Sequence, residues 1–211
     1  MYFISDLHLG VRDKKDDFQE SVLECLRFLV SIPNKSLVLV GDIYDLWEND
    51  YSEIYDKYEN LIDILEAKKY AYIIGNHDSK ISKSFSEKLI INDTLVMHGH
   101  QFDFANKGKG FIGRWMTKMV SWMEKRIWSD IDIPFFKFEM WIKRHGKYAN
   151  AKTFQDVAFD YINDYNVDDR KIKRIITGHT HQLDHAVRGE LEYYNCGTWT
   201  NGHKDVWEIN I

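Results

Sequence analysis

Cysteine and proline are scarce in this chain, which has two of each among its 211 residues. Cys25 falls in a stretch with the apolar spacing of an amphipathic helix, and Cys196 lies far from it in the sequence. Two such cysteines favour buried, reduced thiols over a disulfide framework. They also exclude a structural zinc knot, which requires clustered thiolate ligands.

Long apolar runs are absent as well, since no stretch of about 18 apolar residues exists that could span a bilayer. The chain begins directly with the strand-like run Tyr2-Phe3-Ile4, which leaves no room for the basic and apolar regions of a signal peptide. With 44% hydrophobic and 29% charged residues, the composition is that of a globular protein. We therefore expect a cytoplasmic location.

The chain has less positive than negative charge, with 28 Lys and Arg against 33 Asp and Glu and a net charge of −5. This balance disfavours a nucleic-acid partner, because affinity for polyanions depends mainly on basic surface charge. Residues 105–150 are the exception, with ten Lys and Arg against four Asp and Glu, which leaves −11 on the remainder. This basic segment is either a solvated helix face or a contact for an anionic partner.

The spacing of apolar residues predicts alternating strands and helices. The expected strands are 1–5, 37–40, 71–74 and 172–177, followed by short β segments at 184–188, 191–195 and 205–209. The expected helices are 18–30, 51–67 and most of 105–166, and a hairpin is expected at 89–91 and 95–97. Polar segments follow directly after several of these strands, and open α/β folds build their sites at that end of a sheet.

Five short polar segments carry most of the chemical information. They are Asp6-Leu7-His8, Gly41-Asp42-Ile43-Tyr44-Asp45, Gly75-Asn76-His77-Asp78, His98-Gly99-His100 and Gly178-His179-Thr180-His181. Together they contain six of the nine histidines, with an aspartate or asparagine in each of the first three. Carboxylate, carboxamide and neutral imidazole groups suit Mn, Fe or Zn, so the set predicts a metal site.

The order of these segments resembles that of the calcineurin-like metallophosphoesterase superfamily, whose pattern is D-x-H, GD-x-x-D, GNH-D, H and GH-x-H. The resemblance is most specific for the metal site and least specific between residues 105 and 172. It implies an α/β fold, a four-layered sandwich of two mixed β-sheets flanked by helices. It also implies a single domain over residues 1–211 with a helical lid or cap inserted at about 105–166.

The resemblance implies two divalent metal ions, most readily Mn, with Fe or Zn as alternatives. One ion would be held by Asp6, His8, Asp42 and His181. The other would be held by Asp42, Asn76, His98 and His179. The shared carboxylate of Asp42 would bridge the two ions, because its two oxygens can serve two cations.

His77 is expected to be the catalytic residue that is not a ligand, facing the oxygen of the leaving group. Asp78 is expected to assist it by bonding an imidazole nitrogen, which would fix its tautomer and raise its basicity. Asp45 is expected to hold its loop in place without binding metal. His100 has two interpretations of equal weight, a substrate contact or a cap for the helical region that follows.

The segment between His98 and His179 is far longer than a strand connection requires and is rich in tryptophan and methionine. Its helical pattern is apolar over a wide arc with basic residues interspersed, which predicts a core-packing cap or a lid for an anionic amphiphile. Under the second interpretation Arg114, Trp115 and Trp122 would bind substrate. The 105–150 insert would then also associate with the inner membrane face.

A narrower resemblance is to the UDP-2,3-diacylglucosamine pyrophosphatase branch, carried by Ser5-Asp6-Leu7-His8-Leu9-Gly10, the run 41–47 and the helical insert. Members of that branch tend to have GNRD and HGD where this chain has 75–78 and 98–100. The resemblance implies hydrolysis of a phosphoester or pyrophosphate, on UDP-2,3-diacylglucosamine or a similar nucleotide-linked lipid.

Other functions remain open within the same superfamily. A small-molecule phosphodiesterase and a protein phosphatase share the metal motifs, and repair nucleases share the DLHLG-like start. Those nucleases tend to be larger and to carry additional DNA-binding parts. A catalytically inactive binding scaffold is disfavoured, because every ligand position is intact.

Overall fold

The structure is a computed structural model, and it describes residues 1–11, 18–47, 49–78, 81, 85–102, 153–165 and 171–211. The chain divides into two compact units. The first comprises Met1–His100 and Ala158–Ile211, and the second comprises Gln101–Val157. Most of the expected helical insert, including Arg114, Trp115 and Trp122, lies outside the described residues.

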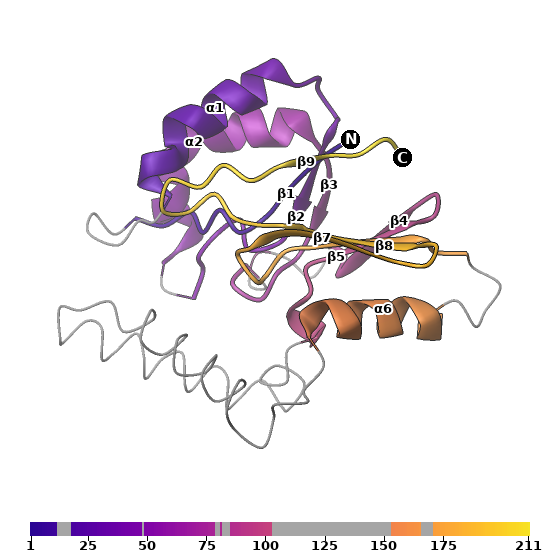
Figure 1. The fold of residues 1–211 in the computed structure, drawn as a ribbon. Helices are drawn as coiled ribbons and strands as arrows, with labels where there is room; N and C mark the ends of the chain where they lie inside the picture. Colours follow the sequence, from indigo (N-terminus) through magenta and orange to yellow (C-terminus); the bar gives the residue numbers. More distant parts are fainter. Residues whose placement is uncertain (12–17, 48, 79–80, 82–84, 103–152, 166–170) are drawn as a thin grey trace. The chain divides into compact units, whose positions relative to one another are not determined.

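A first sheet of four strands has the order β3-β2-β1-β9. β1 (Tyr2–Ile4), β2 (Leu37–Val40) and β3 (Lys69–Ile73) are parallel, and β9 (Trp207–Glu208) runs antiparallel to β1. One face of this sheet is covered by α1 (Val22–Ser31) and α2 (Tyr51–Lys68), which lie side by side (Figure 1). Helix α2 begins with a reciprocal capping box between Asp50 and Glu53, which satisfies two of its free N–H groups.

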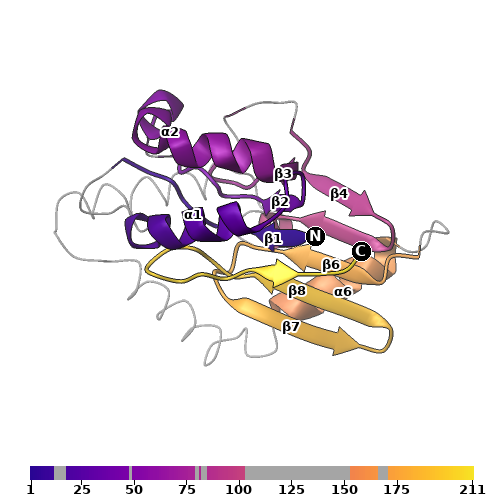
Figure 2. The same ribbon diagram turned by 90° about the horizontal axis from the view of Figure 1, so that it is seen from above.

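A second sheet of five strands has the order β4-β5-β6-β8-β7. Its strands are β4 (Lys88–Ile91), β5 (Thr94–Met97), β6 (Arg174–Thr177), β7 (Leu183–Arg188) and β8 (Leu191–Cys196). β5, β6 and β8 are parallel, while β4 and β7 form antiparallel edges. The outer face is covered by α6 (Phe154–Tyr165), whose Phe159 ring lies 6.3 Å from the Tyr193 ring. Figure 2 shows the two sheets and their helices from above.

Two layers of apolar side chains hold the first unit together. Between the sheets, Phe3 and Val38 pack with Val96 and Ile176. Between the first sheet and its helices, a larger cluster includes Cys25, which is free, as is Cys196. Burial raises the pKa of the Cys25 thiol to about 12. The expectation of two buried, reduced thiols is therefore confirmed.

The expected α/β fold of two mixed sheets with flanking helices is also confirmed. The α-helix predicted from residue 18 begins at Val22, because residues 19–21 form the 3-10 turn η1 (Gln19–Ser21) and no side chain caps the helix. The last β segment is limited to two residues, Trp207 and Glu208. Of the predicted helical insert at 105–166, the structure describes only residues 153–165, which contain α6. The short helix η2 (His100–Phe102) precedes the insert.

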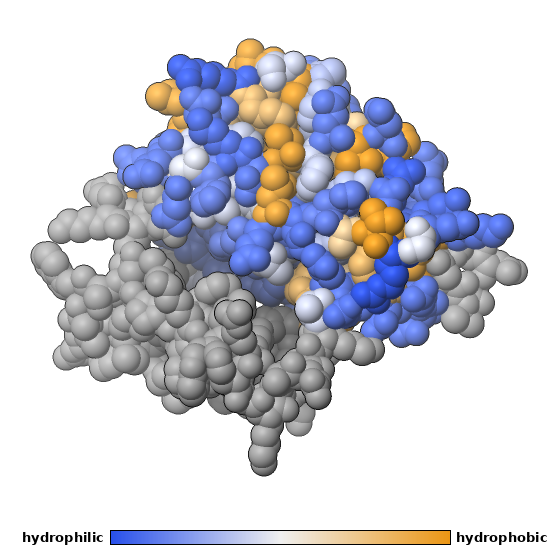
Figure 3. Space-filling model, in the orientation of Figure 1, coloured by the Kyte–Doolittle hydropathy of each residue, from blue (hydrophilic) through white to orange (hydrophobic). Residues whose placement is uncertain are grey.

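On the face drawn in Figure 3, the described surface of the first unit is mostly hydrophilic, with groups of apolar atoms among the polar ones. Leu23 and Val30 on α1 are exposed apolar side chains. Within the described residues, none of the helices combines the length and apolar character needed to cross a membrane.

Candidate metal centre

The candidate metal ligands follow the carboxyl ends of five parallel strands in the two sheets. Asp6 and His8 follow β1, Asp42 follows β2, Asn76 follows β3, His98 follows β5, and His179 and His181 follow β6. Backbone hydrogen bonds continue between neighbouring loops beyond the strands. The Asp6 N–H donates to the Gly41 carbonyl at 3.0 Å, and the Gly178 N–H donates to the His98 carbonyl at 2.9 Å. The structure thus places the candidate ligands together at the carboxyl ends of these strands, as the sequence predicts.

The backbone of the ligand loops is turned into the left-handed region. Five of the eight described non-glycine residues with positive φ are candidate ligands: Asp6, His8, Asp42, His179 and His181, with φ between 48° and 74°. Such conformations are uncommon outside glycine, although Asp, Asn and His adopt them more readily than other residues. They turn consecutive side chains away from the direction that a strand would give them.

Close packing between the loops requires glycine at several positions, Gly41 and Gly75 among them. Gly41 has φ of +87°, and a Cβ there would lie 2.5 Å from Nδ1 of His98. A Cβ on Gly75 would lie 2.1 Å from Oδ1 of Asp42. The glycines that precede Asp42 and Asn76 in the motifs therefore allow the loops of the site to approach one another.

The ligands form two groups, Asp6 with His8 and His181, and Asp42 with His98 and His179. Within each group the ligand atoms lie within 4.8 Å of one another. In the first, Oδ1 of Asp6 is 3.2 Å from Nε2 of His181. In the second, Oδ2 of Asp42 is 3.0 Å from Nε2 of His98. These groups coincide with the two predicted ligand sets, apart from Asn76 and the shared use of Asp42.

In several candidate ligands, one polar side-chain atom is held by a hydrogen bond and a second one faces the site. His98 donates from Nδ1 to the Val40 carbonyl at 2.7 Å, which leaves Nε2 for a metal. Oδ2 of Asp6 accepts the backbone N–H of His179, and Oδ1 of Asp42 accepts the backbone N–H of His77. Asn76 lies between Gly75 and His77, both of which contact Asp42, and its side-chain oxygen is buried.

Two of these atoms test whether the residues fit a cation. Oδ1 of Asp6 and Nε2 of His98 are buried and make no hydrogen bond of good geometry among the described residues, although Nε2 of His181 and Oδ2 of Asp42 lie 3.2 and 3.0 Å from them. Leaving such groups unsatisfied destabilises a fold, and a bound cation would satisfy both. The chemistry of the donors, carboxylate oxygens with imidazole nitrogens, suits Mn, Fe or Zn. The residues therefore fit divalent metal ions.

The electrostatics of the polypeptide alone point the same way. Burial acts to raise the pKa of the Asp42 carboxyl, but the imidazoles of His98 and His77 outweigh it and hold that pKa well below its usual range. Burial acts to lower the pKa of His98, but Asp42 and Asp6 raise it to about 10. The second group thus holds a carboxylate against a protonated imidazole, and a metal ion would replace that proton.

His77 lies against both groups without belonging to either. Its backbone N–H donates to Oδ1 of Asp42, and its ring packs edge-to-face on the ring of His8, with the ring centroids 4.6 Å apart. Its Nδ1 is 3.0 Å from Oδ1 of Asp45, and its face stacks on Trp47. Burial acts to lower the pKa of His77, but Asp42 and Asp45 outweigh it and raise that pKa.

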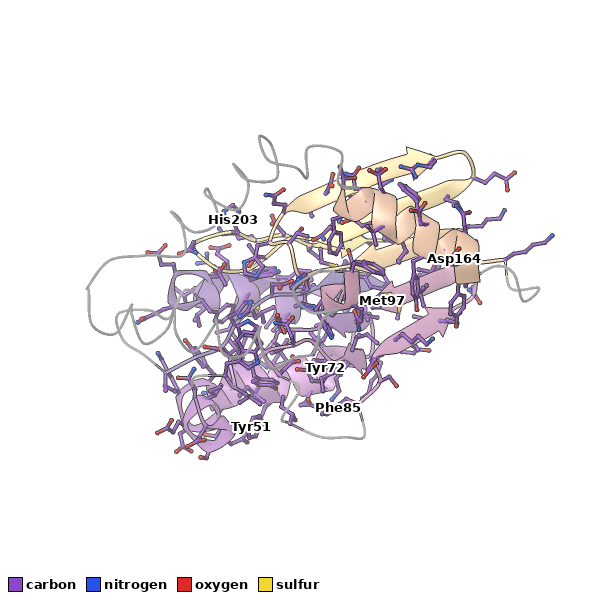
Figure 4. All side chains as sticks on the ribbon, turned by 90° about the horizontal axis from the view of Figure 1, so that it is seen from below. Tyr51, Tyr72, Phe85, Met97, Asp164 and His203 are labelled. Carbon is purple, nitrogen blue, oxygen red and sulfur yellow. The ribbon has the colours of Figure 1, made fainter. Side chains whose placement is uncertain are left out.

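The expectation that Asp78 orients His77 is wrong, because Asp45 makes that contact. Asp78 is fully buried and accepts the N–H groups of Gly75 and Ile43 at 2.6 and 2.9 Å. It also accepts the hydroxyl of Tyr72, which packs beside Phe85, and both are labelled in Figure 4. Burial raises the pKa of Asp78 to about 6. Asp78 therefore joins the loops after β2 and β3 instead of touching the reacting groups.

His100 begins η2, and its ring centroid lies 5.6 Å from that of His98 and 6.5 Å from that of His179. Burial and these two imidazoles lower its pKa to about 4. The structure thus brings His100 beside the second ligand group, as a substrate contact would require, and its role stays a prediction.

Sequence reasoning missed two residues that hold the ligand loops. Asn195, at the end of β8, donates from Nδ2 to the Gly178 carbonyl at 2.7 Å. Thr198 donates from Oγ1 to the Asp6 carbonyl at 2.8 Å. Their segment repeats the pattern of the other ligand loops, a strand followed by glycine and polar residues, although it lacks a histidine. That repetition was the signal available in the sequence.

A two-sheet α/β fold with two groups of carboxylate and imidazole ligands at adjoining strand ends defines the metallophosphoesterase class. Residues 1–183 match the model of the calcineurin-like phosphoesterase family, and the chain belongs to this family.

Two relatives show how far the similarity reaches. The UDP-2,3-diacylglucosamine hydrolase of Neisseria gonorrhoeae (strain ATCC 700825 / FA 1090) is 29% identical over 115 residues, which cover 46% of this chain and 47% of that protein. The chain thus spans about half the length of this relative. A single mutant of Vps29 from Entamoeba histolytica has a similar structure, with a TM-score of 0.50 and 18% identity over 100% of this chain and 87% of that one. The likeness to Vps29 confirms the fold alone.

Proposed function

We propose that this protein is a phosphoester or pyrophosphate hydrolase that uses two divalent metal ions. The observation that carries the proposal is the pair of ligand groups at one sheet edge, with the buried Oδ1 of Asp6 and Nε2 of His98 directed into it. An inactive scaffold would have no need of the uncommon backbone conformations at five ligand positions.

The proposed ligands follow the two groups. Asp6, His8 and His181 would hold one ion, while Asn76, His98 and His179 would hold the other, with Asp42 shared between them. Two bound ions supply an activated water as nucleophile and neutralise charge on the phosphoryl oxygens. Mn is the proposed metal, and Fe and Zn suit the same donors.

His77 is the residue of this chain that we propose to act on the leaving group. Because Nδ1 is held by Asp45, Nε2 is the nitrogen that remains for a substrate. The raised pKa of His77 favours the protonated ring, which can donate a proton or a hydrogen bond. The departing oxygen carries developing negative charge, so donation at that atom lowers the barrier.

For the substrate, we propose UDP-2,3-diacylglucosamine or a similar nucleotide-linked lipid. The Neisseria relative supports this choice by its name, within the half of its length that the chain matches. The basic, tryptophan-rich segment 105–150 supports it by composition, because a lid for an anionic amphiphile requires both properties. The protein would then work in the cytoplasm, on the inner membrane face. A small-molecule phosphodiesterase is the second candidate, because this chain has His77 where members of the lipid branch tend to have arginine.

The experiment is a hydrolysis assay of the full chain after metal removal and readdition of Mn²⁺, Zn²⁺ or Fe²⁺ separately. The substrates are bis-p-nitrophenyl phosphate, a UDP-linked diacyl sugar, a cyclic nucleotide and single-stranded DNA, with products identified by mass spectrometry. We expect metal-dependent release of UMP and the lipid phosphate. The control is Asp93→Asn. Asp93 lies on the turn between β4 and β5, where it forms an ion pair with Arg174, and it is at the opposite end of β5 from His98. Hydrolysis of none of the substrates with any metal would reject the function, and hydrolysis of the diester or cyclic nucleotide alone would favour the second candidate.

A further inference from the structure

Trp47 lies face to face with the imidazole of His77. The ring centroids are 3.8 Å apart and the planes are inclined by 20°. The indole Nε1 of Trp47 donates to the carbonyl of Asn76 at 2.7 Å. The Trp47 side chain thus contacts the backbone of Asn76, an expected metal ligand, and the ring of His77, the residue expected to face the leaving group.

We propose that Trp47 is a positioning residue that fixes the plane of the His77 imidazole during the reaction. This inference rests on the proposed function, because it concerns how His77 meets the leaving group. Trp47 itself is not required to touch the substrate.

The geometry explains why a second contact is needed. The bond from His77 to Asp45 holds one nitrogen at the ring edge, but a single in-plane contact leaves the ring able to rotate about that axis. Trp47 covers one face of the ring, and His8 approaches edge-to-face with planes inclined by 85°. The imidazole is therefore restrained in direction by Asp45 and in plane by Trp47 and His8. Displacement of a reacting group by about 1 Å can lower a rate by about 10²-fold, so such restraint matters for catalysis.

The residues that restrain His77 come largely from one segment of the chain. Trp47 and Asp45 belong to the same loop after β2, which also carries Asp42. The loop is anchored where Asp78 accepts the Ile43 N–H, and again where Asp42 accepts the His77 N–H. The proposed shared carboxylate, the carboxylate that orients the imidazole and the stacking indole thus belong to one segment, which these hydrogen bonds anchor. A movement of this segment would displace all three together.

The test compares Trp47→Phe, which keeps an aromatic face, with Trp47→Leu, which removes it. Each is combined with His77→Ala, and kcat and KM are measured for aryl phosphodiesters whose leaving phenols range from acidic to weakly acidic. Trp207→Phe and Trp207→Leu are the matched controls, because the Trp207 indole also donates to a backbone carbonyl at 2.7 Å, that of Asn195. Metal content and thermal unfolding are measured for every variant, and the histidine ring nitrogens are observed by NMR in the metal-free protein.

We expect Trp47→Leu to lower kcat by about 10-fold or more for weakly acidic leaving groups and by less than about 2-fold for p-nitrophenol, with KM and metal content unchanged. Trp47→Phe should recover most of the loss. In the His77→Ala background, Trp47→Leu should have no further effect, because coupled residues are not additive. The NMR signals of His77 should broaden or shift in Trp47→Leu and stay unchanged in the Trp207 variants.

Two outcomes would overturn the inference while leaving the proposed function intact. One is a loss from Trp47→Leu that is equal for all leaving groups, and the other is a loss that persists in full without His77. Both would mean that Trp47 acts on folding, metal binding or substrate binding instead. Absence of hydrolysis by the wild-type protein would reject the proposed function itself, and in that case an unchanged His77 NMR signal in Trp47→Leu would reject the stacking role independently.

Discussion

The two ligand groups differ in how far they are open to solvent. In the group of Asp6, the side chain of His181 is 45% exposed and that of His8 is 15% exposed. In the group of Asp42, the side chain of His98 is fully buried and that of Asp42 is 2% exposed. The same kinds of ligands therefore form one open and one enclosed half-site. In the enclosed half, His98 and Asp42 lie in the interior of the fold and only His179 is half-buried, whereas the open half exposes His181 to solvent.

The largest effect is expected at Asp42, because its replacement should affect both ligand groups. Asp42→Asn removes the charge of the carboxylate that we propose to be shared, and with it the charged partner of the buried His98. We expect hydrolysis to fall below detection and at least one equivalent of metal to be lost. Metal analysis of the purified variant checks this expectation. Retention of two equivalents of metal would contradict the shared role of Asp42.

His77→Ala should follow, with turnover lowered by about 10²–10⁴-fold, as is typical of a general acid or base. Because His77 touches both groups without supplying a ligand atom to either in the proposed scheme, both metals should remain bound. Rates are compared across a series of leaving groups, and good leaving groups should lose least. A loss of the same size throughout the series would show that His77 positions phosphate instead.

The difference in burial between the two groups predicts unequal losses of stability for His98→Ala and His181→Ala. Removing His98 leaves the buried Asp42 carboxylate without its ion-pair partner, which should destabilise the metal-free protein by about 3–5 kcal/mol. Removing the half-exposed His181 leaves His8 near Asp6, and we expect a cost below about 1 kcal/mol. Urea unfolding of both metal-free variants measures the two values. Equal destabilisation would show that the two halves do not differ as their burial indicates.

The smallest effect is expected for Trp115 and Trp122, which lie outside the described residues. If they line a lid for an acyl chain, a small polar residue at either position should raise KM for a long-chain substrate and leave bis-p-nitrophenyl phosphate hydrolysis unchanged. Each buried CH₂ contributes about 0.8 kcal/mol, so the effect should grow with chain length. Kinetics on substrates of two chain lengths, with Tyr70→Phe as a surface control, decide this. Indifference to chain length would contradict the lipid substrate.

Most of the described fold was predictable because short apolar runs such as β2 and helical apolar patterns such as α2 are well separated along the chain. The position of the candidate ligands at the sheet edge was predictable because each lies in the segment that follows a strand. The partner of His77 was not, because adjacency in sequence favoured Asp78 while the loop after β2 brings Asp45 to the ring. Asn195 and Thr198 were missed because support through hydrogen bonds to backbone carbonyls requires no distinctive residue type.

The left-handed backbone at the ligand positions has a consequence for how the protein can evolve. Each such non-glycine residue costs on the order of 1–3 kcal/mol, so the loops are held in their conformation by the rest of the fold, before any ion binds. Replacing His8 or His179 by glycine would relieve that strain, and the metal-free protein would then be more stable while the site is lost. Stability and function are therefore in opposition at these positions. Mutations at these two positions can therefore disable the site without unfolding the protein, and a binding protein can arise from an enzyme on the same fold.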